Sequence, residues 1–244
     1  MRNTDNDWME IGKNEPYFGV LANPKFLKKN LSDEILNEFY DSGQEDVNAL
    51  ISVFNRYFDK FQPKKALDFG CGVGRMTVPM AKYVPSVVGV DISEYMLNEA
   101  RKNFERFSVN NIELFGSLPD NHFYDWINSL IVFQHIPPKR GYEILENLLR
   151  KINIGGFVSL HFTIFRDKNH LDEIYRDIEC CMYDGDTIKV LSRKEQSLGD
   201  MTMYEYDLNQ ILSILVDNGL INVYMEHTNH GGCHGVKIFS KKVS

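Results

Sequence analysis

The sequence predicts an α/β fold, a doubly wound and mostly parallel sheet of seven strands with helices on both faces. Two observations predict it. Short apolar segments alternate with segments of helical periodicity along most of the chain. One unit, residues 66–91, contains in order a strand, a glycine loop, a helix, a second strand and an acid. A glycine loop between a strand and a helix is typical of the nucleotide-binding half of such a sheet.

The glycine loop follows the apolar strand 66–69 and carries Gly70, Gly72 and Gly74 at alternate positions. Glycine allows a tight turn and a close approach of the backbone to a ligand, because no Cβ stands in the way. The helix behind the loop offers free N–H groups and a partial positive charge to an anionic group. The second strand ends at Asp91, whose carboxylate can accept hydrogen bonds from two ribose hydroxyls.

The spacing of the loop distinguishes between ligands. A dinucleotide fingerprint needs a glycine at position 75, where this chain has Arg75. The spacing is instead G-x-G-x-G, with an acid, Asp68, two residues before the first glycine. In this pattern the sequence resembles the class I S-adenosylmethionine-dependent methyltransferases, over residues 64–242 and most clearly over 66–156. An unrelated α/β protein with a glycine loop, or an NAD site, is the alternative.

The resemblance implies a Rossmann-like methyltransferase fold and S-adenosylmethionine as the cofactor. It places Gly70, Cys71, Gly72 and Gly74 along the methionine portion and Asp91 at the ribose. The other cofactor-binding residues that we expect are Asp68, which would also orient the loop, Arg75, Ile92, Met96, Ser117, Leu118 and Gln134. Many family members have an acid at position 117 for the adenine amino group, so the serine leaves that contact to the backbone around it.

Composition limits the partners. The 244 residues carry a net charge of −7, and their basic residues form isolated pairs. This argues against a nucleic acid, because phosphate contacts need a clustered positive face. No apolar segment reaches the length of a membrane span, and the N-terminus lacks a signal pattern, so we expect no membrane partner. Four cysteines form no disulfide framework, which favours the cytoplasm. The sequence leaves the oligomeric state open.

We expect one methyltransferase domain over residues 1–244. Residues 1–60 form an N-terminal arm with helices at 33–41 and 45–61, the first capped by Ser32. The arm either packs its aromatic side chains on the surface or, as the resemblance implies, folds across the methionine end of the cofactor, with Tyr17 as the contact. The other parts are the cofactor-binding core (64–164), a lid-like insertion (165–203), and a terminal helix with two strands (204–244).

Seven segments are expected to be strands: 66–69, 87–90, 111–115, 125–132, 157–162, 221–226 and 235–241. The main core helices are expected to end near Tyr83, to begin after the capping residue Ser93, and to span 137–152 and 207–218. The insertion departs from the carboxyl end of the fifth strand, where ligands of open α/β sheets bind. It is expected to contain a helix at 169–181 and a hairpin turn at Asp184-Gly185.

His135 follows the fourth strand and therefore lies at the same sheet edge as the glycine loop. It is the first candidate for a proton acceptor, since its ordinary pKa is near 6.5; a structural role at the start of the next helix is the alternative. The turn 227–234 brings three histidines and Cys233 to that edge, with His230 and His234 as alternative bases. A metal site there is the less favoured reading, because no second ligand cluster is visible, so no metal is predicted.

The function that we expect is methyl transfer from S-adenosylmethionine to an oxygen or nitrogen of a polar small molecule, such as a sugar or a biosynthetic intermediate. Catalysis would consist mainly of holding nucleophile, methyl carbon and sulfur in line with water excluded. The alternative is a cofactor-binding protein without transfer activity, acting as a sensor or an assembly partner.

Overall fold

The computed structural model describes residues 4–58, 60–168, 178–183, 188–192, 198–199 and 201–244. Its helices and strands are, in chain order, α1 (Thr4–Asn14), α2 (Pro16–Val20), η1 (Pro24–Phe26), η2 (Lys28–Asn30), α3 (Asp33–Tyr57), β1 (Lys65–Phe69), α4 (Thr77–Tyr83), β2 (Ser86–Val90), α5 (Glu94–Arg106), β3 (Ile112–Phe115), β4 (Tyr124–Ser129), η3 (Phe133–His135), α6 (Pro138–Arg150), β5 (Ile152–Arg166), β6 (Ile178–Tyr183), β7 (Ile188–Ser192), α8 (Leu208–Asp217), β8 (Val223–His230) and β9 (Cys233–Lys241).

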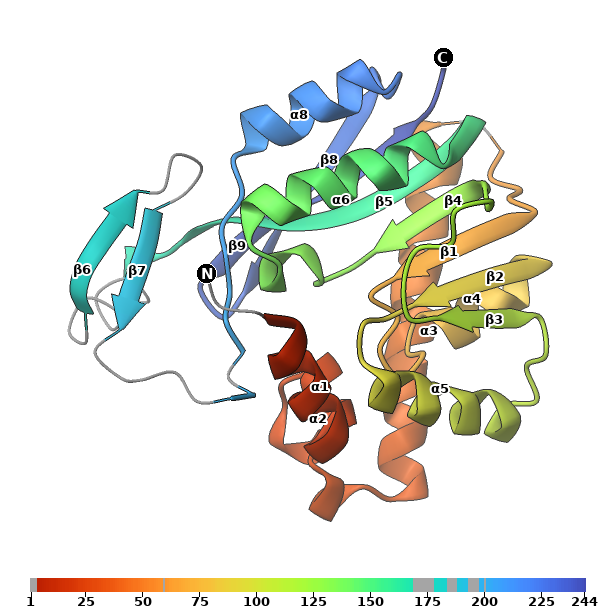
Figure 1. The fold of residues 1–244 in the computed structure, drawn as a ribbon. Coiled ribbons are helices and arrows are strands. Elements are labelled where there is room, and N and C mark those ends of the chain that lie inside the picture. The colour runs from red at the N-terminus through yellow and green to blue at the C-terminus, as the bar shows by residue number, and fades with distance from the viewer. Residues whose placement is uncertain (1–3, 59, 169–177, 184–187, 193–197, 200) are drawn as a thin grey trace.

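Seven strands form one sheet in the order β3-β2-β1-β4-β5-β9-β8 (Figure 1). The first five run parallel, whereas β9 pairs antiparallel with both β5 and β8. The order reverses between β1 and β4, and the crevice of a doubly wound sheet opens at the carboxyl ends of the strands beside that point. The predicted fold class, a seven-stranded and mostly parallel doubly wound sheet, is confirmed.

Helices cover both faces because consecutive strand residues point to opposite sides. Ala66, Val87 and Trp126 pack against α3 and α4 on one face. Their successors in each strand, such as Leu67 and Ile127, pack against α6 and α8 on the other face. The parallel strands are therefore apolar on both sides, as the sequence indicated.

The predicted caps of α3 and α5 are confirmed. The side chain of Ser32 accepts a hydrogen bond from the Ile35 N–H at 3.2 Å, and Ser93 accepts one from the Met96 N–H. The expected break between two helices near residue 43 is wrong, because α3 is one helix. Gly43 lies within this helix because it lets the backbone of α3 approach Arg75: a Cβ at Gly43 would lie 2.1 Å from the backbone oxygen of Arg75. The glycine thus serves the close contact of α3 with the loop and does not end the helix.

The bounds of two further segments differ from expectation. β4 ends at Ser129, and the chain turns at Ile131, which has a φ of 59°. The expected helix at 169–181 is wrong over 178–181, which belong to β6; residues 169–177 lie outside the described residues. β6 and β7 pair antiparallel on either side of the expected hairpin turn, which itself lies outside the described residues. In Figure 1 this pair stands beyond the carboxyl ends of the sheet.

The terminal hairpin is tighter than expected. β8 continues to His230 and β9 begins at Cys233, so the turn consists of two glycines and not of eight residues. Gly231 and Gly232 have φ values of 63° and 93°, the left-handed conformation that a two-residue hairpin turn requires. The histidines of this region therefore lie on strands.

Candidate functional site

The glycine loop between β1 and α4 is held in a conformation that other residues could adopt only with strain. Gly70, Gly72 and Gly74 have φ values of 76°, 53° and 89°. A Cβ on Gly70 would lie 2.3 Å from the side chain of Val132, which follows β4. The N–H of Gly70 donates to the carbonyl of Val90 at 2.8 Å, and this contact ties the loop to the end of β2. The loop is thus a fixed backbone surface at the switch point of the sheet.

Asp91 directly follows β2 and faces the loop. Its carboxylate accepts hydrogen bonds from the backbone N–H groups of Gly72 at 2.8 Å and Ser93 at 2.9 Å. Burial nevertheless raises the pKa of Asp91 to about 6, and these two hydrogen bonds only partly oppose that rise. A ligand whose hydroxyl groups donate to this carboxylate would favour the ionised form.

Asp68 on β1 is buried beneath the loop. It accepts hydrogen bonds from the hydroxyl of Thr77 at 2.7 Å and from the amide of Asn128 at 2.9 Å. Burial raises its pKa, and both bonds act in the opposite direction. The carboxylate therefore connects β1 with α4 and β4, which fits the expected role of orienting the loop.

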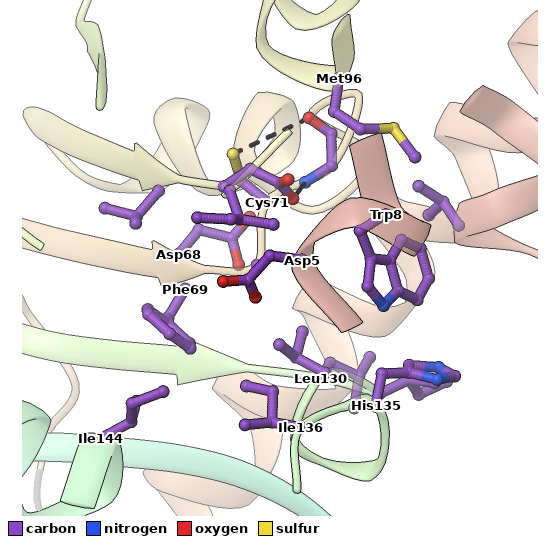
Figure 2. Close-up of a pocket in the computed structure, with 18 of the residues that line it drawn as sticks. Asp5, Trp8, Asp68, Phe69, Cys71, Met96, Leu130, His135, Ile136 and Ile144 are labelled. Atoms are coloured by element: carbon purple, nitrogen blue, oxygen red, sulfur yellow. Dashed lines mark hydrogen bonds between the residues drawn. The ribbon is translucent and has the colours of Figure 1, made fainter. Parts of the chain in front are cut away.

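A cavity of about 320 Å³ opens along these residues (Figure 2). Eleven of the expected site residues line it: Asp68, Gly70, Cys71, Gly72, Arg75, Asp91, Ile92, Met96, Ser117, Leu118 and His135. The sequence therefore predicted correctly that residues from four separate segments meet, because the carboxyl ends of parallel strands share one edge.

Five expected residues do not line the cavity: Tyr17, Gly74, Gln134, His230 and His234. The hydroxyl of Tyr17 contacts Glu99 and Asn103 of α5, each at 3.0 Å, so this side chain anchors the arm to the domain. Gly74 instead faces Phe104 of α5, where a Cβ would lie 2.6 Å from the ring.

The N-terminal arm does reach the cavity, but through other residues. Thr4, Asp5 and Trp8 of α1 line it together with Gly19 and Val20. Figure 2 shows Asp5 and Trp8 pointing into the cavity. Helix α1 can lie this close because Gly12 leaves room for Ser93 and Met96 at the start of α5. The aromatic residues of the arm predicted its contact with the cavity. No sequence pattern within residues 1–14 identified Asp5 as a lining residue.

Arg75 takes the position of the missing third dinucleotide glycine. Its guanidinium donates to the carboxylate of Asp46 at 2.7 Å and to the hydroxyl of Ser42 at 3.2 Å, both on α3. The residue is 5% exposed. Arg75 therefore fastens α3 to the back of the glycine loop, while part of it lines the cavity.

His135 lies at the cavity wall with both ring nitrogens engaged. Nδ1 lies 3.0 Å from the carbonyl oxygen of Thr202, and Nε2 lies 3.1 Å from the amide nitrogen of Gln134. A carbonyl only accepts, so the proton of the neutral ring belongs on Nδ1, and Nε2 accepts from Gln134. The carbonyl oxygen of that amide accepts from Thr163 at 2.9 Å. The ring of Trp8 packs edge-on against the imidazole, with centroids 4.8 Å apart.

Burial lowers the pKa of His135 to about 4, with the Thr202 contact opposing the shift only weakly. The imidazole is therefore neutral at physiological pH. The lone pair of the neutral ring lies on Nε2, where it accepts the hydrogen bond from the Gln134 amide. The sequence correctly predicted that His135 lies at the site. It could not predict this hydrogen-bond network, because Thr202 lies 67 positions away along the chain.

The histidines of the terminal hairpin lie at the same edge but beyond the cavity. His227 and His234 contact each other, with Nε2 and Nδ1 2.9 Å apart, and Phe165 stacks on His234. His230 packs edge-on against His161, whose Nε2 lies 2.9 Å from the Thr228 hydroxyl. Within the described part of the chain, no three or more His, Cys, Asp or Glu side chains gather as a metal site.

Comparisons with known proteins agree with this geometry. The model of a methyltransferase domain family matches residues 66–156, the segment from β1 to β5. A magnesium protoporphyrin IX methyltransferase from Synechocystis PCC 6803 with bound SAM has a TM-score of 0.63 at 16% identity, covering 99% of this chain and 98% of that one. The N-methyltransferase NodS from Bradyrhizobium japonicum WM9, in complex with S-adenosyl-L-homocysteine, has a TM-score of 0.62 at 10% identity over the whole of both chains.

Among curated proteins, a 23S rRNA (uracil(1939)-C(5))-methyltransferase from Haemophilus influenzae is 38% identical over 88 residues, covering 34% of this chain and 20% of that protein. A probable S-adenosyl-L-methionine-dependent methyltransferase, TehB, also from Haemophilus influenzae, is 28% identical over 142 residues, covering 50% and 48%. The chain thus spans between a fifth and a half of these relatives. The expected resemblance to class I methyltransferases is confirmed, and the likeness to solved structures confirms the fold.

One expectation is corrected. The acidic composition argues against a nucleic acid and favours a small molecule as the partner, yet the curated relatives include several 23S rRNA methyltransferases. The inference failed because net charge is a sum over the whole chain, whereas phosphate binding depends on the local potential of one face. Among the residues that the structure describes, no helix is long and apolar enough to cross a membrane.

Proposed function

We propose, from the match of residues 66–156 to a methyltransferase domain family, that the chain transfers a methyl group from S-adenosylmethionine to an acceptor in the same cavity. The observation that carries the proposal is that one continuous cavity is lined by the glycine loop, by Asp91 and by the residues that follow β4. The first two suit the cofactor, and the third leaves a wall for the acceptor.

The fit to the cofactor rests on the backbone and on Asp91. The glycines of the loop have positive φ values, and a Cβ on Gly70 would lie 2.3 Å from Val132. The floor of the cavity therefore consists of backbone without side chains. We propose that the methionine portion lies along this floor and that Asp91 accepts from the ribose hydroxyls. Ile92, Met96, Ser117 and Leu118 then line the adenine end. The cofactor, when bound, supplies an electrophilic methyl group on a sulfonium.

The chain's own contribution to catalysis is alignment and exclusion of water. Trp8 and Asp5 cover the cavity from α1, and the glycine loop fixes the opposite wall. Holding two reactants in line can supply several kcal/mol of a barrier, roughly 7–11 in the best cases. This places the main catalytic demand on the shape of the cavity.

For His135 we propose a positioning role. Its ring connects the turn after β4 with Thr202 and with Trp8 of α1. Both ring nitrogens are engaged, so proton transfer from a hydroxyl acceptor to His135 would require the Gln134 contact to open. An acceptor that is already neutral and nucleophilic needs no such base.

Two acceptor classes have support from different observations. A polar small molecule is supported by the cover that α1 forms over the cavity. An RNA base is supported by the rRNA methyltransferases among the relatives. In either case residues 165–203, of which the structure describes only parts, are the proposed recognition segment of the single domain.

The test uses the purified chain with S-adenosylmethionine and two acceptor sets, a panel of small hydroxyl and amine compounds and a preparation of unmodified 23S rRNA. Formation of S-adenosylhomocysteine that depends on one set identifies the class. Asp91→Ala should abolish the signal, whereas Lys139→Gln, an exposed change outside the cavity, should not. Binding of the cofactor without turnover on any acceptor would favour a sensor, and absence of binding would refute the proposal.

A further inference from the structure

The cavity contains an ion pair between residues 135 positions apart in sequence. Nη1 of Arg140, in the first turn of α6, donates to the Asp5 carboxylate of α1 at 2.6 Å. Both residues line the same cavity as Asp91 and the glycine loop. The side chains are 44% and 31% exposed, so solvent and small solutes reach the pair. An anion is therefore already bound to Arg140 inside the cavity, and it belongs to the chain itself.

The two arginines that line the cavity differ in availability. Arg75 is buried and joined to Asp46, which does not line the cavity. Arg140 is half-exposed, and its carboxylate partner projects from α1 into the cavity. The N-terminus of α6 adds partial positive charge at the same place. The neighbouring lining residues Ile136 and Ile144 are apolar, which suits the uncharged part of a ligand.

We propose that Arg140 binds an anionic group of the methyl acceptor, a phosphate or a carboxylate, and that Asp5 occupies this position until the acceptor displaces it. The inference rests on the proposed function and names the chemistry that its acceptor site recognises. Exposed ion pairs typically contribute less than about a fivefold change in an equilibrium constant, so Asp5 is readily displaced. Guanidinium groups suit both anions because their N–H groups match the geometry of the oxygen atoms.

The experiment uses the full chain saturated with S-adenosylhomocysteine, so that the cofactor's own carboxylate is already placed. Inorganic phosphate, and separately acetate, is titrated at constant ionic strength maintained with chloride, and binding is followed by the rise in unfolding temperature. Asp5→Asn removes the competing charge at nearly constant shape, and Arg140→Gln removes the cation. Lys139→Gln, one residue earlier on the exposed surface, is the matched control for net charge.

Phosphate should bind Asp5→Asn about three- to fivefold more tightly than the unaltered protein, the size expected for removal of an exposed pair. Arg140→Gln, alone or combined with Asp5→Asn, should abolish that binding, and Lys139→Gln should leave it unchanged. Affinity for S-adenosylhomocysteine is measured on every variant. If Asp5→Asn gains no anion affinity while the cofactor still binds, the inference is wrong and the proposed function stands.

Two further arms identify the source of the anion. A single-stranded RNA oligonucleotide that binds the cofactor-loaded protein and weakens with Arg140→Gln assigns the group to a nucleic-acid phosphate. Phosphate binding that depends on Arg140 without such RNA binding assigns it to a small acceptor. If Arg140→Gln instead weakens S-adenosylhomocysteine itself at least tenfold and phosphate never binds, Arg140 holds the cofactor, which overturns the inference.

Discussion

The carboxylate of Asp91 accepts a hydrogen bond from the backbone N–H of Gly72 at 2.8 Å. This contact joins the acid that directly follows β2 to the middle of the glycine loop, across 19 residues of sequence. Two features that the sequence indicated separately are thus one structural unit. The four experiments that follow test this unit and the residues around it.

Asp91→Asn should weaken S-adenosylhomocysteine binding at least tenfold, because hydrogen bonds to a charged acceptor contribute about 1.5–3 kcal/mol each. The affinity of the unaltered protein should also depend on pH. In the ligand-free protein the pKa of Asp91 is about 6. Ribose hydroxyls favour the ionised carboxylate, so binding of the cofactor releases a proton below that pH. Affinity should therefore rise from pH 5 to pH 7 and then level off. Calorimetry at several pH values measures this.

The control is the variant itself: without a titrating carboxylate, Asp91→Asn should show no such slope. A pH-independent affinity in the unaltered protein would mean that the ribose does not contact Asp91.

Gly74→Ala and Gly155→Ala separate backbone strain from crowding. Both glycines have similar positive φ values, 89° and 82°. A Cβ on Gly74 would lie 2.6 Å from the Phe104 ring, whereas a Cβ on Gly155 would have no atom within 4 Å. Both variants should lose about 1–2 kcal/mol through the left-handed backbone. Gly74→Ala should lose about 1–3 kcal/mol more through overpacking. Urea unfolding compares them, and equal losses would contradict the close packing of the loop on α5.

His135 should make the fold sensitive to acid. Its pKa is about 4 in the folded chain against an ordinary 6.5, so the unfolded chain binds the proton more readily. The stability that the neutral ring contributes is complete above pH 6.5 and is lost progressively as the pH falls from 6.5 to about 4. The loss should be about 3 kcal/mol by pH 4. His135→Gln should remove that part of the pH slope. Urea unfolding between pH 7 and pH 4 measures it.

Burial also lowers the pKa of His161, to about 3, so protonation of His161 destabilises the fold over the same pH range. This residue is present in both proteins. The variant's curve should therefore be flatter but not flat. Identical slopes for the two proteins would show that His135 is not buried as a neutral ring. A turnover rate that rises through pH 6.5 and loses this rise in His135→Gln would instead favour the proton-acceptor role.

Trp8→Ala should weaken S-adenosylhomocysteine binding by roughly three- to tenfold, because it removes an aromatic wall of the cavity and its edge contact with His135. Tyr17→Phe is the matched control in the same arm. It deletes the hydroxyl that contacts Glu99 and Asn103, so stability should fall by about 1 kcal/mol with cofactor affinity unchanged. The reverse pattern would return the cofactor contact to Tyr17.

What the sequence predicted well rests on local rules. Short apolar segments predicted the parallel strands, Ser32 and Ser93 predicted two helix starts, and glycine spacing with Asp91 predicted the crevice at the switch point. Each of these follows from a few neighbouring residues. The errors arose where a local signal had a distant cause. Gly43 resembled a helix break because the backbone of Arg75, which requires it, lies 32 positions away along the chain.

By itself, the sequence determined the fold class and the residues at the carboxyl edge of the sheet, because strand periodicity and glycine spacing encode them directly. Only the tertiary structure decided which side chains of that edge share one cavity and in which state. In the tertiary structure Asp5 forms an ion pair with Arg140, and Tyr17 contacts α5 in place of the cavity. Both ring nitrogens of His135 form hydrogen bonds. The physical reason is that pairing and pKa depend on burial and on partners far apart in the chain, which no local pattern records.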